Sequence, residues 1–589
     1  MSTNISGEKR QALLARIAEI KLFIEQNSND KNASQLISYL GDLIREVNGK
    51  KYGLVFEEHR EAIDEKLEQN APILIEEKDL FIDNGGELNF LLEGDNLASL
   101  KLLEKTHRGK IDVIYIDPPY NTGNKDFVYD DDYVDSVDQF RHSKWLSFME
   151  KRLKIARSLL SDKGVILLSI DDNEMNNLKM LCDSIYGENN NLGIFIVKST
   201  PNARDYGFVG KMHEYILFYA KNFDKVETNL MPVLDKTFKY SDEKGGFNIH
   251  PLYNSNEAFT NENRPNLFYP FYLNPNNQND DFYEISLEKQ KDWIEIYPPK
   301  SVKNNVQFVW RWGKEKSIEN LNKEIIGYKV SDGEYRIVQK MRHDEKLIRS
   351  ILDNSDYTSR KGTAELEQIF NEKKFSFPKP LNLIKDIIFM ASTGTSTILD
   401  FFAGSGTTGH AVLKLNAEDG GHRKFILCTN NENNICREIT YQRLKTVITG
   451  TRKDGSKYSD GLPGSLKYFK TDFISISEKM YYEYADDLLL HVRELVELEN
   501  AVNFDKDKTV AIVLDDDEME EFIATLVESG RNEQKDTSTG LSVRSTGLSV
   551  RALYVGHDVL VSGKQERILK LHNISINTIP DYYYRDLAL

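Results

Sequence analysis

The fold is decided by Ile111-Asp112-Val113-Ile114-Tyr115-Ile116-Asp117-Pro118-Pro119-Tyr120, a largely apolar run of strand length that stops at two prolines. A second stretch has the same form: Ile398-Leu399-Asp400-Phe401 runs into Phe402-Ala403-Gly404-Ser405-Gly406-Thr407. Runs of β-branched and aromatic residues that end in turn-forming residues are typical of buried parallel strands, which carry functional loops at their carboxyl ends. The two stretches predict an α/β fold with a doubly wound, Rossmann-like sheet.

The first loop has the groups needed to hold a planar nitrogen nucleophile. The lone pair of an exocyclic amine on a nucleobase is delocalised into the ring, so the amine attacks only when its hydrogens are drawn out of the plane. The Asp117 carboxylate and the Pro118 carbonyl can accept those two hydrogens, because Pro118 and Pro119 fix the backbone of the loop. Tyr120 offers a stacking face for the base. One misaimed acceptor of this kind costs roughly 3–4 kcal/mol of transition-state stabilisation.

The second loop is a glycine-rich turn between a strand and a helix, which lets a ligand approach the backbone N–H groups of Gly404 to Gly406. Residues 408–415 have the pattern of the helix that follows, and residues 424–428 that of the next strand. In nucleotide sites an acid roughly 20 residues beyond the glycines binds the ribose hydroxyls. Glu432 is the candidate for that role; the alternative is a solvated loop acid.

These motifs resemble those of the DNA amino methyltransferases that use S-adenosylmethionine. The Asp-Pro-Pro-Tyr tetrad comes before the Phe-x-Gly-x-Gly motif, which is the order of the β group. The resemblance is closest to the modification subunits of type III restriction-modification systems. It is carried by residues 93–97, 117–123, 164–174 and 400–408, and it spans about Gly94 to Arg443.

The resemblance implies a set of site residues. Asp117, Pro118, Pro119 and Tyr120 match the catalytic motif. The cofactor S-adenosylmethionine would be held by the glycine-rich loop and by Lys379-Pro380, which match the segment before it, while Asp95 matches a position near the cofactor adenine. The members of the loop are Asp400, Phe402, Ala403, Gly404, Ser405, Gly406, Thr407 and Thr408. An aspartate at the first position of the tetrad implies adenine N6 as the target, and the transfer requires no metal.

The composition changes along the chain suggest five segments. Residues 1–75 have helical periodicity, 76–220 form the first part of a catalytic core, and 376–470 form its second part. Residues 471–589 read as an acidic α/β module for protein contacts, with strands at 552–555 and 559–561. Residues 221–375, rich in Asn, Pro and aromatic residues, separate two loops that must share one site, so we expect an inserted target-recognition domain.

Cations and aromatic residues alternate in two stretches of that inserted segment, as on surfaces that touch phosphates and bases. The candidates for DNA contact are Arg264, Arg311, Trp312 and Lys314. The alternative is that the aromatic residues form the core of the lobe.

Length and composition fit a large cytoplasmic enzyme of about three or four domains. The 589 residues contain no run of 18 apolar residues, and Cys182, Cys428 and Cys436 have no paired spacing. The net charge of −17 argues against a nucleic-acid enzyme. Much of the excess acid lies in the tail: residues 471–589 carry about 12 Lys and Arg against about 23 Asp and Glu, whereas residues 198–380 carry about 28 against about 27.

We therefore expect a site-specific adenine-N6 methyltransferase that acts on double-stranded DNA and pairs with a second copy of itself. The type III resemblance implies a separate helicase-nuclease subunit as a further partner. This chain has no Gly-x-x-x-x-Gly-Lys-Ser/Thr loop for binding ATP itself. The alternatives are a stand-alone DNA or RNA adenine methyltransferase and a cofactor-binding regulatory protein without transfer activity. An exact repeat, Ser538 to Arg544 copied as Ser545 to Arg551, reads as a tolerated surface-loop duplication.

Overall fold

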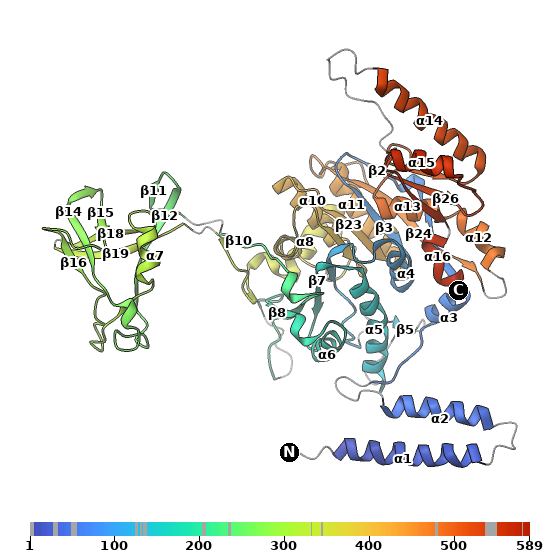
Figure 1. The fold of residues 1–589 in the computed structure, drawn as a ribbon, viewed down its shortest axis with the longest axis horizontal. Helices are drawn as coiled ribbons and strands as arrows, with labels where there is room; N and C mark the ends of the chain where they lie inside the picture. The colour runs from blue at the N-terminus through green and yellow to red at the C-terminus, as the bar shows by residue number, and fades with distance from the viewer. Residues whose placement is uncertain are drawn as a thin grey trace. The chain divides into compact units, whose positions relative to one another are not determined.

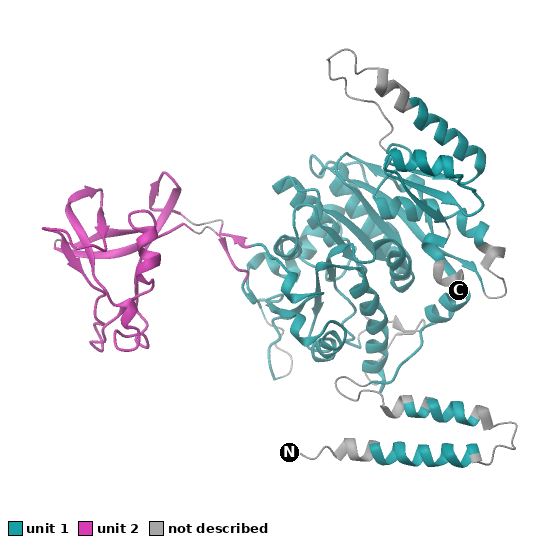
Figure 2. Ribbon diagram, viewed as in Figure 1, with its two compact units in different colours: residues 1–229, 349–589 teal, residues 230–348 magenta. Residues whose placement is uncertain are grey.

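The structure is a computed structural model. It describes residues 5–26, 33–48, 56–123, 128–129, 132–133, 138–202, 208–233, 237–331, 333–342, 345–476, 481–535, 550–579 and 581–588. The chain divides into two compact units (Figure 2). Unit 1 comprises residues 1–229 and 349–589, and unit 2 comprises residues 230–348. Most of the tandem repeat, residues 538–549, lies outside the described residues.

The core of unit 1 is an 11-stranded sheet with the order β1-β24-β3-β23-β22-β4-β7-β9-β8-β21, with β2 paired to β24 (Figure 1). The strands from β24 to β7 in this order are parallel, β9 runs antiparallel to β7 and β8, and β1 and β2 run antiparallel to β24. Their bounds are β1 Asn70–Glu76, β2 Ile82–Asp83, β3 Leu88–Glu93, β4 Ile111–Ile116, β7 Leu160–Ile170, β8 Asn191–Val197, β9 Glu214–Ala220, β21 Ile351–Leu352, β22 Thr397–Asp400, β23 Lys424–Thr429 and β24 Ser465–Ser475.

The helices of unit 1 join and pack on these strands because they have continuous apolar faces. α5, for example, buries Trp145, Met149, Leu153 and Ala156, which recur every three or four residues. The helices that flank the sheet are α4 Asn96–His107, α5 Arg141–Leu159, α6 Met175–Tyr186, α8 Ser359–Phe370, α9 Leu381–Ala391, α10 Thr407–Asp419 and α11 Tyr441–Thr449. A small antiparallel pair, β5 Val128–Tyr129 and β6 Asp132–Tyr133, follows β4. The doubly wound α/β class predicted from the sequence is confirmed.

Unit 2 is built on a seven-stranded antiparallel sheet with the order β11-β12-β19-β18-β15-β14-β16. Its core contains Phe271, Leu273, Ile285, Trp310 and Ile337. The bounds are β11 Tyr240–Asp242, β12 Gly245–Pro251, β14 Phe271–Asn279, β15 Phe282–Ser286, β16 Ile294–Ile296, β18 Ile325–Ser331 and β19 Glu334–Met341, together with α7 Lys314–Asn320 and the pairs β10 Met231–Pro232 with β20 Glu345–Lys346 and β13 Tyr253–Asn254 with β17 Val309–Trp310.

The inserted unit is smaller than the segment 221–375 drawn from composition. Residues 349–375 belong to unit 1 because β21 pairs with β8, through Ile351 beside Ile196, and because α8 buries Leu366 and Ile369. Composition does not separate the two, since this stretch is as polar as the lobe.

The N-terminal helical segment also ends earlier than expected. α1 Ile5–Gln26 packs on α2 Ala33–Asn48, and α3 Ala62–Gln69 follows. Residues 70–75 are part of β1, whose Ala71, Ile73 and Leu74 are buried in the main sheet.

The boundary at residue 471 is wrong because β24 crosses it and pairs with β3 in the middle of the sheet. Of the elements that follow, α13 buries Leu495 and Val496 in the core of unit 1, and Tyr584 donates to the Pro72 carbonyl at 2.9 Å. These elements are α12 Tyr481–Leu489, α13 Val492–Asn500, β25 Val510–Val513, α14 Asp516–Lys535, β26 Ala552–Gly556, α15 Gly563–Leu571, β27 Ser575–Ile579 and α16 Asp581–Ala588, with β25, β26 and β27 forming a parallel sheet.

None of the helices in the described ranges combines the length and the apolar character that crossing a bilayer requires.

Candidate functional site

The two loops predicted to act together follow neighbouring strands. β22 pairs in parallel with β4, with Ile398 beside Val113 and Leu399 beside Ile114. From β22 the sheet continues through β23 and β3 on one side and through β4 and β7 on the other, so the strand order reverses between β22 and β4. Loops at such a reversal form the crevice in which ligands of doubly wound sheets bind.

The Asp-Pro-Pro-Tyr turn is held rigidly from behind. Trp145 of α5 is fully buried and donates from Nε1 to the Pro119 carbonyl at 2.7 Å. Asn121 closes the turn with a positive φ of 55° and donates to the buried Glu174 carboxylate at 2.5 Å. A left-handed backbone is favoured at Asn among non-glycine residues, so the sequence Tyr-Asn suits this turn.

Four polar side chains from three segments meet at the end of β4. The Lys379 Nζ lies 2.7 Å from the Glu214 carboxylate, 2.5 Å from the Tyr120 hydroxyl and 3.3 Å from Asp117 Oδ1. The Tyr120 hydroxyl also donates to Glu214 at 3.2 Å. Asp117 and Tyr120 come from the turn after β4, Glu214 begins β9, and Lys379 precedes α9. The carboxylate of the predicted catalytic residue therefore faces a fixed ammonium.

Burial and charge act against each other in this cluster. Burial raises the pKa of Asp117; Lys379 opposes the rise and Glu214 adds to it, leaving the pKa above its usual value. Burial would raise the pKa of Glu214 too, but the ion pair with Lys379 outweighs it and the pKa is lowered. Burial lowers the pKa of Lys379, yet the two carboxylates raise it above its ordinary range, so the ammonium stays charged.

The glycine-rich loop passes close to two other segments. Gly404 and Gly406 have φ of 49° and 75°, which side-chain-bearing residues rarely adopt. A Cβ at Gly406 would lie 3.2 Å from Thr440 Cγ2, and the Thr440 hydroxyl donates to the Gly404 carbonyl at 2.6 Å. The loop leads directly into the N-terminus of α10 at Thr407.

A buried arginine supports this loop from below. Arg443 of α11 is fully buried and donates from one nitrogen to Thr407 Oγ1 at 2.7 Å, to Ser405 Oγ at 3.1 Å and to the Ser405 carbonyl at 3.3 Å. Burial lowers its pKa to about 10. The loop thus combines a helix N-terminus with a nearby positive charge, and both favour an anionic group of a ligand.

Asp400 shapes the first half of the loop. Its carboxylate accepts from the Phe402 N–H at 2.9 Å and from the Thr408 hydroxyl at 2.5 Å. Burial raises its pKa to about 7. Asp400 therefore joins the start of the loop at Phe402 to its end at Thr408.

The segment before α9 joins the two loops. Pro380 is the N-cap of α9, and the Lys379 carbonyl accepts from Thr407 Oγ1 at 3.3 Å while the Lys379 side chain reaches Asp117. Lys379 was expected only on the cofactor side, and the structure places it between the catalytic turn and the glycine-rich loop.

Asp95 and Glu432 follow the neighbouring parallel strands β3 and β23. Asp95 is the N-cap of α4 and accepts from the Leu97 N–H at 2.7 Å. Glu432 is exposed in the short turn after β23. Both carboxylates lie at the edge of the sheet where the glycine-rich loop begins.

The four candidates for DNA contact lie in unit 2. Arg264, Arg311 and Lys314 are exposed, and Arg311 donates to the Tyr253 carbonyl at 3.2 Å. Trp312 is half-buried under Lys316 Nζ, which lies 4.4 Å from its ring. Trp310, from the same stretch, is in the core of the lobe. The cations are thus available on the surface while part of the aromatic content serves packing.

Sequence reasoning missed Arg443 as a member of the site. It noticed Glu214 only within residues 213–215, which resemble a family segment near the target-base pocket, with a strand that carries an edge histidine as the alternative. Glu214 begins an antiparallel strand and pairs with Val197, so it lies at the same edge as the carboxyl ends of the parallel strands. The signal that could have found it is an acid at the start of a strand that returns from this edge. Nothing local in the sequence distinguishes Arg443 from a surface arginine.

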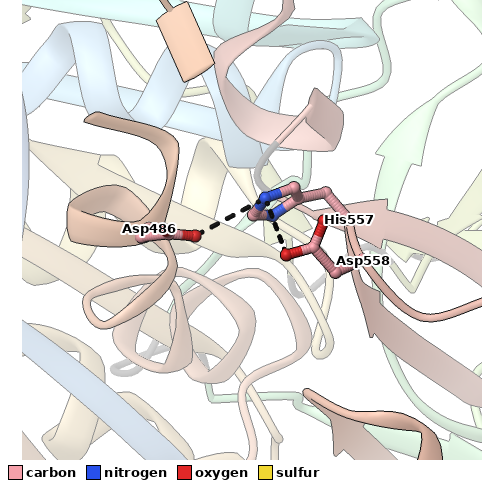
Figure 3. Close-up of side chains that lie close together, drawn as sticks. All are labelled: Asp486, His557 and Asp558. Atoms are coloured by element: carbon pink, nitrogen blue, oxygen red, sulfur yellow. Dashed lines mark ion pairs between the residues drawn. The ribbon is translucent and has the colours of Figure 1, made fainter. Parts of the chain in front are cut away.

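A separate cluster lies in the C-terminal segment (Figure 3). His557 Nε2 is 3.5 Å from Asp486 Oδ1 and 3.5 Å from Asp558 Oδ2. Both carboxylates are exposed.

The profile of the N6/N4 DNA methylase family matches residues 111–442. Type II methyltransferase M.KpnI of Klebsiella pneumoniae is 35% identical over 385 residues, which cover 65% of this chain and 90% of the relative. The EcoPI Mod subunit of a type III restriction-modification enzyme, from Escherichia phage P1, is 33% identical over 387 residues, which cover 59% of this chain and 58% of that subunit.

Among solved structures, PvuII DNA methyltransferase (cytosine-N4-specific) aligns with a TM-score of 0.30 and 11% identity, over 59% of this chain and 86% of that one, and a score this low adds no argument. The family match covers more than half of the chain and includes both loops, and M.KpnI is matched over most of its length. The chain therefore belongs to the N6/N4 DNA methylase family.

Proposed function

We propose that this protein transfers a methyl group from S-adenosylmethionine to N6 of an adenine in DNA. The proposal rests on the environment of one atom, Asp117 Oδ1. It is buried at the end of β4 and accepts no hydrogen bond within the described part of the chain, although Lys379 lies 3.3 Å away. A buried acceptor without a donor is costly, so a site that keeps one is suited to a ligand that brings the donor.

The target amine supplies such a donor. When the base enters the crevice, Asp117 Oδ1 accepts one amine hydrogen and the Pro118 carbonyl accepts the other, which directs the nitrogen lone pair out of the ring plane. Tyr120 presents its ring to the base. The adenine must leave the duplex to reach this crevice, at a cost of a few kcal/mol. Aspartate at this position supports adenine N6 over cytosine N4, the other target of the family.

The cofactor fits the second loop. Gly404 and Gly406 let a ligand approach the backbone, and the α10 N-terminus and Arg443 favour the carboxylate of the methionine end. Glu432 would bind the ribose and Asp95 would lie near the adenine. When bound, S-adenosylmethionine supplies an electrophilic methyl group on a sulfonium, so the protein needs no general base before the transfer.

Unit 2 is the proposed target-recognition domain, with Arg264, Arg311 and Lys314 as contacts to the DNA backbone and Trp312 beside them. Its residues are inserted in the sequence between the two segments that form the catalytic crevice, so changes in unit 2 leave those segments intact. The likeness to the EcoPI Mod subunit supports a role as the modification and recognition subunit of a type III system, with a separate helicase-nuclease partner.

A second copy of the chain is a further proposed partner. The α1–α2 hairpin leaves apolar side chains of both helices exposed, namely Leu13, Ile20, Leu22, Leu36 and Leu43. Two hairpins of this kind can bury such faces against each other in a four-helix arrangement.

The test is to express the protein in a host without adenine methylation and to sequence the genomic DNA by a method that detects modified bases. We expect N6-methyladenine within one sequence motif, absent with Asp117→Ala, whose S-adenosylmethionine binding should persist. Methylation of one strand only would favour the type III role.

Other results would point elsewhere. N4-methylcytosine in the motif would contradict the assignment of adenine. Unmodified DNA, from protein that binds the cofactor, would favour an RNA target or a regulatory protein without transfer activity.

A further inference from the structure

Glu214 and Lys379 form an ion pair that touches the catalytic turn without closing it. Lys379 Nζ has two short contacts, to Glu214 at 2.7 Å and to the Tyr120 hydroxyl at 2.5 Å, and a longer one of 3.3 Å to Asp117 Oδ1. The longer contact is an ion pair, and among the described residues no hydrogen bond with full donor and acceptor geometry ends on Asp117 Oδ1.

The ammonium therefore lies closer to Glu214 and Tyr120 than to the catalytic carboxylate. Glu214 is the partner that fixes this position, since it contacts Lys379 directly and also accepts from the Tyr120 hydroxyl at 3.2 Å. Without Glu214, we expect the ammonium to move closer to Asp117, because a hydrogen bond to a carboxylate is stronger than one to the neutral Tyr120 hydroxyl.

We propose that Glu214 and Lys379 are positioning residues for methyl transfer: the ammonium keeps Asp117 ionised, and Glu214 keeps the ammonium off the Asp117 oxygen that must accept the target amine. The proposal rests on the proposed function for its substrate, but its electrostatic part concerns side chains present in the free protein. Without the cation, the half-buried carboxylates of Asp117 and Glu214 would face each other and one would take up a proton.

Behind the turn, Asn121 donates to the buried Glu174, which also contacts His142 Nδ1 at 2.6 Å. The groups that act on Asp117 itself come from other segments. They are Lys379 before α9, Glu214 of β9, Asp400 after β22, Tyr115 of β4 and Tyr120 of the turn itself. Lys379 is the one cation among them, and burial together with Asp117 raises the pKa of Tyr120 well above its ordinary value, so that hydroxyl stays neutral. Removing Lys379 therefore leaves carboxylates as the only charged groups in this set.

Three variants of the full chain test the proposal: Lys379→Met, Glu214→Gln and the double variant. The matched control is Lys385→Met, which removes another lysine of unit 1. Lys385 lies on α9, and its Nζ pairs with the Glu418 carboxylate at 2.8 Å instead of with the catalytic turn. Each protein is studied by thermal unfolding across pH and by the pH profile of kcat/KM for DNA methylation.

Thermal unfolding measures how the charges of Asp117, Glu214 and Lys379 affect stability, and it does not require activity. Below the pKa values of the carboxylates the missing cation matters little, whereas above them both carboxylates must ionise unpaired. We therefore expect the melting temperature of Lys379→Met to fall increasingly below that of the wild type as the pH rises from about 5 to about 8. The double variant should recover much of the difference, and Lys385→Met should show only a small one.

The activity profiles read the positioning role. In Lys379→Met the acid limb of kcat/KM should move to higher pH, with a loss of about 100-fold near pH 6 that shrinks at higher pH, and the double variant should regain about 10-fold. In Glu214→Gln the freed ammonium should bind Asp117 and compete with the amine, lowering kcat/KM by about 10-fold to 100-fold while the acid limb moves to lower pH.

A difference in melting temperature that does not change with pH would overturn the proposal whether or not the protein methylates DNA. A loss of kcat/KM that is equal at every pH would also overturn it, since a merely structural lysine would behave in that way. A widening difference together with a wild type that methylates no DNA would support the charge balance and overturn the proposed function.

Discussion

At the scale of single residues, Arg443 and Arg423 make a natural comparison. Both are buried guanidinium groups next to the main sheet. Arg443 lies under the glycine-rich loop, whereas Arg423 precedes β23 at the opposite edge and pairs with Asp419 at 2.9 Å and with the Ser392 hydroxyl at 3.0 Å. Similar burial at opposite edges separates a role in stability from a role in ligand binding.

We predict that Arg443→Met weakens S-adenosylmethionine binding by about 10-fold to 100-fold, equivalent to roughly 1.4–2.8 kcal/mol. The substitution removes three hydrogen bonds to Ser405 and Thr407 and the positive charge beneath the loop. The fold should lose less, because the desolvation cost of the buried charge is lost with it. Titration calorimetry measures the affinity, and thermal unfolding the stability.

Arg423→Met is the matched control for this prediction. It breaks an ion pair and a hydrogen bond far from the loop, so it should lower the melting temperature and leave the cofactor affinity unchanged. Equal affinities for wild type and Arg443→Met would show that the loop keeps its shape without the arginine.

The site residues that could be predicted from sequence are those whose role depends on the local backbone conformation. Pro118 and Pro119 fix a turn, and Gly404 and Gly406 permit one. Both loops could therefore be predicted from a few adjacent residues. Glu214 and Arg443 act through side chains brought in by strand pairing and helix packing over long sequence distances. Their roles depend on β9 returning beside β7 and on α11 packing under α10, which no short motif records.

At the scale of elements, α13 shows why the C-terminal part is not a separate module. Its residues Val492, Leu495 and Leu498 are fully buried in the core of unit 1, as is Leu488 of the preceding α12. Glu497 of α13 lies 2.6 Å from Lys467 of β24, and both side chains are almost wholly buried. The acidic composition of residues 471–589 suggested a solvated module, but composition does not reveal which helix face is covered.

We predict that Leu495→Ala destabilises unit 1 as a whole, by about 3 kcal/mol, because a buried leucine is replaced by a cavity. Thermal unfolding with and without S-adenosylmethionine is the measurement. The transition that the cofactor raises should be the one that the substitution lowers, since α13 and the site share one core. Leu490→Ala, at a position 74% exposed just after α12, is the control and should have little effect.

An unchanged cofactor-stabilised transition in Leu495→Ala would show that the C-terminal part unfolds independently.

The prediction of strands in this part was half right. Residues 552–555 lie in β26, whereas residues 559–561 lie outside any strand, after a turn at residues 557–558. There the Val559 N–H donates to the Gly556 carbonyl and the Leu560 N–H donates to the Asp516 carboxylate. A short apolar run was mistaken for a strand there, and the third strand is β27.

At the scale of the whole molecule, the inserted unit explains how an acidic protein can belong to a family that modifies DNA. The net charge of −17 is a sum over the whole chain, and much of the excess of acids over bases lies in residues 471–589. Unit 2 presents Arg264, Arg311 and Lys314 on its surface. Affinity for DNA depends on local phosphate contacts, so a lobe with exposed cations can bind DNA even when the total charge is negative.

The connections to unit 2 make it removable. β10 and β20, at its two ends, pair antiparallel with Met231 beside Lys346, so the chain enters and leaves through adjacent strands. On the side of unit 1, Asn229 is anchored by hydrogen bonds to the carbonyls of Phe389, Met390 and Ser392. A short glycine-serine linker from Asn229 to Arg349 should therefore replace residues 230–348 without strain in the sheet.

We predict that this shortened chain folds, binds S-adenosylmethionine within about threefold of the wild-type affinity and methylates no specific motif. Both halves of the catalytic crevice lie in unit 1, whereas the proposed DNA contacts lie in unit 2. Calorimetry and sequencing of modified bases are the two measurements, and full-length Asp117→Ala is the complementary control, which should bind the same DNA without modifying it. Motif-specific methylation by the shortened chain would place recognition in unit 1. Loss of cofactor binding in a folded, shortened chain would instead show that unit 2 supports the site itself.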